Sequence, residues 1–241
     1  MGDINFRLLM RAVVMTIKFH LLDACDEISA RQRRAILREL RDALVTVSTH
    51  LTVDRVDIVV APGKWVIPEY GFTGRTEGKG RVSITIDPDS SRLDEPQRRE
   101  HLLGVLAHEL HHVVRGRGPG FGRSLGETMV SEGLAQCFEE EVGAPTPFYA
   151  VFLDSPALAK ASAKARDTAS SLHHDYNAWF FGRPGDPEWP RYAGYSLGYA
   201  IVKAWLDEND ATAAESATVP ANDIIGPWLG DARDIIVHPT R

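Results

Sequence analysis

Two histidines and a glutamate stand at a spacing that suits metal chemistry. His108, Glu109 and His112 follow the order His-Glu-x-x-His. Positions four apart lie on one face of a helix, one turn apart, so both imidazoles can bind one metal ion. Glu109 then stands beside the position that the protein leaves open on that ion. The pattern predicts a zinc site with Glu109 as the general base.

A catalytic zinc site usually has three protein ligands and one water, so a further ligand is needed. Downstream, Ser124 and Glu127 have the spacing of a capping box, which gives Glu127 a structural explanation. Glu132 falls in the middle of the same predicted helix among apolar residues, where a lone carboxylate is costly. We therefore expect His108, His112 and Glu132 to bind one zinc ion per chain.

The neighbouring His111 offers an alternative ligand, because it lies three residues after the first histidine. We prefer His112, because that register leaves Glu109 in the general-base position. The metzincin pattern, which needs Gly and His three and six residues after the second histidine, is excluded, since Arg115 and Gly118 occupy those positions.

This set of residues resembles the gluzincin metallopeptidases of the thermolysin type, in which two histidines and a glutamate on a following helix bind zinc. Glu132 follows His112 by twenty residues, and residues 131–135 and 194–199 are similar to a bacterial family of predicted zinc-dependent proteases, long carried as a domain of unknown function. The resemblance implies hydrolysis of a peptide or protein substrate. It also implies a zincin-like active-site helix.

One position departs from the thermolysin type. Four residues after the glutamate ligand, that type has an aspartate that orients a zinc-bound histidine, and this chain has Gln136. An amide oxygen could still accept a hydrogen bond from His108, so the sequence leaves the role of Gln136 open.

Three tyrosines share one face of the last long predicted helix. Tyr192, Tyr195 and Tyr199 fall at positions i, i+3 and i+7, and Val202 and Leu206 continue the same stripe. A tyrosine hydroxyl could stabilise the oxyanion of a tetrahedral intermediate, whereas the continued stripe is typical of core residues. We name Tyr195 and Tyr199 as candidate catalytic donors, with Tyr195 preferred because the family resemblance centres on it.

The first third of the chain has a mixed α and β pattern. Residues 13–22 and 56–60 are β-rich, and a capping-box pattern opens a helix at Ser29. Residues 71–80 are rich in glycine and predict a turn. Residues 81–87 alternate apolar and polar side chains, which predicts a strand at the edge of a cleft, where an extended peptide could add as a further strand.

The remainder of the chain has a helical pattern. Helices are predicted over residues 96–115, 124–142 and 155–179, the last carrying His173 and His174, and a fourth ends near Asn209. Gly194 and Gly198 are poor helix formers, so they indicate a close approach of another backbone or a ligand.

These elements predict an α+β fold in a single domain over residues 1–241. Residues 1–95 are expected to form a small antiparallel sheet with helices, and residues 96–241 a mainly helical part. The two parts are expected to flank one cleft.

Composition and charge exclude other classes of protein. The 27 basic residues against 33 acidic residues give a net charge of −6, which disfavours nucleic acid as a partner. The most apolar N-terminal stretch, residues 8–22, contains Arg11, Lys18 and His20, so it predicts neither a membrane helix nor a signal peptide. We expect a cytoplasmic protein with no cofactor besides zinc, and the oligomeric state stays open.

The leading hypothesis is hydrolysis of a peptide bond by a zinc-activated water. The alternatives are a non-catalytic module that keeps zinc for stability and binds a peptide, and a zinc hydrolase of a non-peptide amide or ester. Glu109 disfavours the binding module, because a structural zinc site usually closes its fourth position with a protein ligand.

Overall fold

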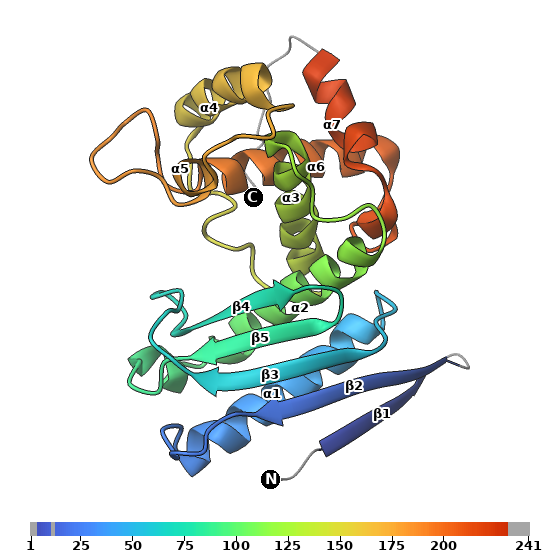
Figure 1. The fold of residues 1–241 in the computed structure, drawn as a ribbon, viewed down its shortest axis with the longest axis vertical. Coiled ribbons are helices and arrows are strands. Elements are labelled where there is room, and N and C mark those ends of the chain that lie inside the picture. Colours follow the sequence, from blue (N-terminus) through green and yellow to red (C-terminus); the bar gives the residue numbers. More distant parts are fainter. Residues whose placement is uncertain (1–3, 11–12, 231–241) are drawn as a thin grey trace. The chain divides into compact units, whose positions relative to one another are not determined.

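A computed structural model describes residues 4–10 and 13–230 of the chain (Figure 1). The described residues form two compact units. The first runs to Arg117 and includes residues 142–145, and the second contains residues 118–141 and those from Thr146 onward. The division falls after Arg117 and not at residue 95, so the first helix of the predicted helical part belongs with the sheet. A single domain with one cleft stays a prediction.

The first unit is built on a mixed sheet with the strand order β1-β2-β3-β5-β4. Its strands are β1 (Ile4–Met10), β2 (Val13–Leu21), β3 (Val56–Pro62), β4 (Phe72–Glu77) and β5 (Arg81–Ile86). The α+β class is confirmed, but the prediction of an antiparallel sheet is wrong, because β2–β3 and β3–β5 are parallel pairs. The helix between β2 and β3 returns the chain to the same end of the sheet, which makes these two strands parallel.

Strand β4 replaces the turn predicted over residues 71–80. The chain is extended from Phe72 to Glu77 and turns only over residues 78–80, before β5. Strand β5 was predicted at the edge of a cleft, but it pairs with β3 on one side and β4 on the other. The edge strand on this side of the sheet is therefore β4.

Two helices lie on the same side of the sheet, α1 (Ala30–Ser48) and α2 (Arg98–Arg117) (Figure 1). The predicted capping box of α1 is confirmed, since Ser29 and Gln32 exchange hydrogen bonds. A buried Glu39 joins the helices, because its carboxylate accepts from Nε and Nη2 of Arg98 at 2.9 and 2.7 Å. A short 3₁₀ helix, η1 (Ser91–Asp94), precedes α2. The start of α2 is thus fixed to α1 by a two-pronged ion pair.

The second unit is helical, as predicted. It contains α3 (Leu125–Glu141), α4 (Ser155–Thr168), α5 (Tyr176–Phe180), α6 (Ala193–Asn209), the 3₁₀ helix η2 (Glu215–Thr218) and α7 (Ala221–Gly230). The helix predicted over residues 155–179 is two helices, because Asp175 caps a new one through the backbone N–H of Ala178 at 3.0 Å. His173 and His174 lie in the connection and not on a helix.

Helices α3 and α6 meet at two glycines. A Cβ on Gly133 would overlap the carbonyl oxygen of Gly198, and a Cβ on Gly198 would overlap the carbonyl oxygen of Met129. The predicted close approach is therefore confirmed at Gly198, where the neighbour is a backbone. At Gly194 the neighbour is the ring of Phe180, 2.7 Å from the position of a Cβ.

No helix in the described ranges combines the length and the apolar character needed to cross a membrane.

Candidate active site

The His-Glu-x-x-His segment lies in α2, as its spacing required. His108, Glu109 and His112 are all buried, with 8%, 7% and 4% of their surfaces exposed. The rings of the two histidines lie next to each other, with their centroids 4.6 Å apart and their planes at 85°. Two nitrogen ligands one helical turn apart can therefore face one ion.

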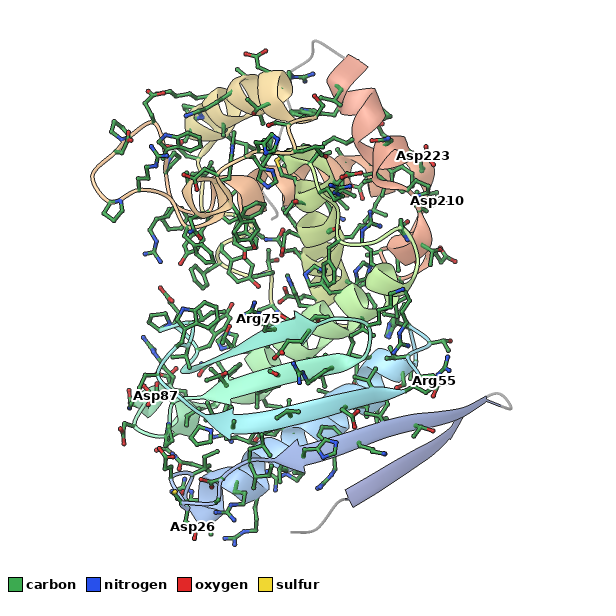
Figure 2. The ribbon with its side chains drawn as sticks, viewed as in Figure 1. Asp26, Arg55, Arg75, Asp87, Asp210 and Asp223 are labelled. Atoms are coloured by element: carbon green, nitrogen blue, oxygen red, sulfur yellow. The ribbon has the colours of Figure 1, made fainter. Side chains whose placement is uncertain are left out.

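Glu109 lies against the edge strand β4. The hydroxyl of Thr76 is 2.7 Å from Oε2 of Glu109 and 2.8 Å from its backbone carbonyl oxygen. Two residues earlier in the strand, a Cβ on Gly74 would stand 2.5 Å from Cγ of Glu109. Arg75 (Figure 2) lies between them in the strand and is exposed, as the alternation of strand side chains requires. The sheet thus supports the carboxylate that sequence reasoning named as the general base.

Sequence reasoning missed Thr76 and Gly74. The signal was present, since Phe72-Thr-Gly-Arg-Thr-Glu77 contains residues that favour strands. Gly74 and the Gly78–Gly80 turn made the whole stretch look like a loop. What no local pattern could show is that this strand runs along α2.

Helix α3 supplies the third predicted ligand. Glu127 accepts hydrogen bonds from the backbone N–H groups of Arg123 and Ser124 at 2.7 and 2.9 Å, and these donors lower the pKa of its carboxyl group. The predicted capping box therefore accounts for Glu127. Glu132 lies in the middle of α3 and is half-buried. The hydroxyl of the preceding Ser131 donates to the carbonyl of Phe121 at 2.7 Å.

Among the residues that the structure describes, one group of three histidine or acidic residues could hold a metal ion. Its members are His108, His112 and Glu132. His111, which offered the alternative register, is fully buried and is not in this group. Two imidazole nitrogens and one carboxylate oxygen are a donor set that suits zinc.

The two candidate tyrosines differ in their surroundings. Tyr199 is buried, and its hydroxyl lies 2.9 and 3.0 Å from the carboxylate oxygens of Glu140. Burial and the charge of Glu140 raise the pKa of Tyr199 far above its ordinary value. Tyr195 is half-buried, and its ring lies 5.0 Å from that of Tyr149 and 4.9 Å from that of Phe180. Catalytic roles for Tyr195 and Tyr199 stay predictions.

The residue before α6 has a backbone conformation that bulky residues rarely adopt. Tyr192 has φ 62°, and no side chain caps the helix that it opens. Its ring contacts Phe148 and Phe152 edge-on, and the guanidinium of Arg191 lies 4.6 Å from its centroid. The ring of Tyr192 is thus buried among these side chains, which is typical of a core residue.

Gln136 is fully buried, and neither atom of its amide has a hydrogen-bond partner in the part of the chain that the structure describes. The hydrogen bond from His108 to this amide oxygen, which the sequence left open, is not present in the structure. Burial of an unpaired polar group costs about 1–3 kcal/mol.

The variant Gln136→Met should therefore raise the melting temperature of the metal-free protein by about 2–10 °C, measured by circular dichroism. Gln32→Met is the control and should lower it, because Gln32 completes the capping box of α1. A lower melting temperature for Gln136→Met would show that its amide is hydrogen-bonded in solution.

A protein family, a bacterial protein and a solved structure are similar to this chain. Residues 38–226 match the model of a family described as "Predicted Zn-dependent protease (DUF2268)". The protein YjfC of Bacillus subtilis (strain 168) is 24% identical over 170 residues, which are 65% of this chain and 55% of that protein. An aminopeptidase N family protein from Idiomarina loihiensis has a crystal structure that matches with a TM-score of 0.48 and 12% identity, over 97% of this chain and 43% of that chain.

This chain therefore spans about half the length of the proteins that it matches. The family match covers more than half of this chain and includes α2, α3 and α6, which carry the candidate residues. The resemblance to a family of predicted zinc-dependent proteases is confirmed. The chain belongs to the family described as predicted Zn-dependent protease (DUF2268).

Proposed function

We propose that this protein is a zinc-dependent peptidase in which His108, His112 and Glu132 bind the metal and Glu109 is the general base. The observation that carries the proposal is the buried histidine pair on α2, with the carboxylate of Glu109 next to it in sequence and held against β4. A structural zinc site has no use for such a carboxylate. The family description and the group His108, His112 and Glu132 support the same function.

Bound zinc would act as a Lewis acid that polarises the substrate carbonyl and lowers the pKa of water to about 7. Glu109 then accepts a proton at its carboxylate from the attacking water and returns it to the leaving amine. His108 and His112 would hold the metal through unprotonated ring nitrogens. Burial of these groups excludes bulk water, which strengthens their electrostatic effect on the reacting atoms.

The substrate would lie along β4. This strand pairs with β5 on one side, and among the residues that the structure describes no strand lies beyond it. An extended peptide can add to such an edge through backbone hydrogen bonds, which would place its carbonyl groups near Glu109. The sequence assigned this role to residues 81–87, and we now assign it to β4.

For the oxyanion donor we propose Tyr195 over Tyr199. The hydroxyl of Tyr199 is engaged by the carboxylate of Glu140. The raised pKa of Tyr199 keeps its hydroxyl protonated. Because this hydroxyl is buried and already bonded to Glu140, we assign it to the packing of α3 against α6. We retain a cytoplasmic location and a peptide or protein substrate as proposals.

The ligand assignment is tested by zinc binding. Glu132→Gln keeps the size of the side chain and removes its charge, and we expect the zinc affinity to fall by at least 100-fold, since the loss of even an outer partner costs about 10–100-fold. Wild type should hold about one zinc per chain by metal analysis after dialysis. Glu208→Gln, at an exposed position on α6, is the matched control and should bind zinc like wild type.

Equal affinity for Glu132→Gln and wild type would contradict the ligand assignment. The class of reaction is tested on a mixed peptide library and a set of simple esters. Cleavage of peptides supports the proposal, and cleavage of esters alone would favour a hydrolase of non-peptide substrates. Zinc binding without any cleavage would favour the non-catalytic binding module.

A further inference from the structure

The contact between β4 and α2 centres on one side chain. The single hydroxyl proton of Thr76 has two acceptors in reach, and both belong to Glu109: Oε2 of the carboxylate at 2.7 Å and the backbone oxygen at 2.8 Å. Donation to the carboxylate is the stronger interaction, because hydrogen bonds to charged groups are roughly twice as strong as neutral ones. The hydroxyl therefore binds one carboxylate oxygen.

Gly74 has no side chain, and this leaves space on β4 for the side chain of Glu109. A Cβ at this position would lie 2.5 Å from Cγ and 2.9 Å from Oε1 of Glu109, and 2.8 Å from Cγ1 of Val105. Real Cβ atoms essentially never come this close, so a larger residue would displace the glutamate. The side chain of Glu109 thus lies across the bare backbone of β4, with the hydroxyl of Thr76 at its end.

The sheet itself does not require these two residues. Thr76 pairs with Val82 and Gly74 pairs with Ile84, and both partners are fully buried apolar residues. On this face an apolar side chain at either position would continue the core, and glycine weakens a strand. A hydroxyl and a missing side chain at these positions are both explained by the presence of Glu109.

We propose that Thr76 is a positioning residue for Glu109, which it orients through Oε2 so that Oε1 is left to accept the proton. Gly74 provides the space in which this orientation is possible. The inference rests on the proposed function, because it takes Glu109 as the general base. It adds that β4 supplies the contact that fixes the direction of this base.

The test compares Thr76→Val with Thr76→Ser. Valine keeps the shape and removes the hydroxyl, so we expect kcat on the best library peptide to fall by about 10–100-fold, with KM and zinc content close to those of wild type. Serine restores the hydroxyl and should recover most of kcat. Thr85→Val, on the opposite face of the neighbouring strand β5, is the control and should keep both kcat and KM.

Two further measurements separate positioning from a general loss of structure. Gly74→Ala should lower kcat while zinc binding is kept, because it displaces Glu109 without removing any polar group. In metal-free protein, Thr76→Val should lower the melting temperature, and this effect should shrink in a Glu109→Ala background, where the acceptor is gone. If Thr76→Val lowered the melting temperature equally in the wild-type and Glu109→Ala backgrounds, the proposed contact between Thr76 and Glu109 would be contradicted.

The failures of the two proposals are distinguishable. If Glu109→Gln is fully active, the proposed function fails. If Glu109→Gln is inactive and Thr76→Val has the kcat of wild type, the positioning role fails alone. A loss of kcat in Thr76→Val that serine does not recover would also overturn it, because the hydroxyl would then not be the cause.

Discussion

Glu109→Gln is expected to retain about one zinc per chain and to lower kcat by about 10²–10⁴-fold, the usual contribution of a general base. Glutamine keeps the size of the side chain, and its amide oxygen can still accept the hydrogen bond from Thr76, so the contact with β4 is preserved. It cannot take a proton from water. The measurement is steady-state kinetics on a library peptide together with metal analysis of the same sample.

Glu100→Gln is the matched control, because Glu100 is an exposed glutamate on the same helix. It should keep both the zinc content and kcat. If Glu109→Gln retained kcat, another group would have to be the base. If Glu109→Gln lost zinc, Glu109 would be a metal ligand, and its proposed role as general base would be wrong.

Gly198→Ala is expected to have the largest effect on stability. A Cβ at this position would overlap the carbonyl of Met129, which is backbone and cannot turn aside. Overpacking of this kind costs about 1–3 kcal/mol, occasionally more, and we expect the upper end, or a fall in melting temperature of roughly 6–12 °C. Thermal unfolding followed by circular dichroism measures it.

The control is Gly226→Ala on α7, where a Cβ would meet no atom within 4 Å. There alanine should be neutral or stabilising by up to about 1 kcal/mol, because it has a better helix propensity than glycine. Equal melting temperatures for Gly198→Ala and Gly226→Ala would mean that α3 and α6 separate without cost in solution. Separation of these helices would also move Glu132, which precedes Gly133 at the crossing.

The features that could be predicted from the sequence depend on neighbours along the chain. The capping boxes at Ser29 and Ser124 and the helical face of His108 and His112 involve residues at most four apart. The close approach at Gly198 was also predictable, because glycine inside a long helix needs a packing reason. The sequence did not show that the close neighbour of Gly198 is the backbone of Met129.

The features that could not be predicted depend on pairing between distant segments. Whether β3 runs parallel to β2 and β5 is decided when the sheet assembles. The residue pattern of one strand does not determine the direction of its neighbours. The edge position of β4 has the same origin. Thr76 was missed for this reason, since its meaning comes from Glu109, 33 residues away.

The ion pair between Glu39 and Arg98 has a consequence for how this chain can change over evolution. It fixes the start of α2, and the contact of Thr76 with Glu109 fixes the same helix eleven residues further on. Each residue of a helix turns the chain by about 100°, so an insertion or deletion between these two anchors would swing the glutamate away from the strand. Relatives that keep both anchors should therefore differ in this stretch by substitution alone, and its length should be constant.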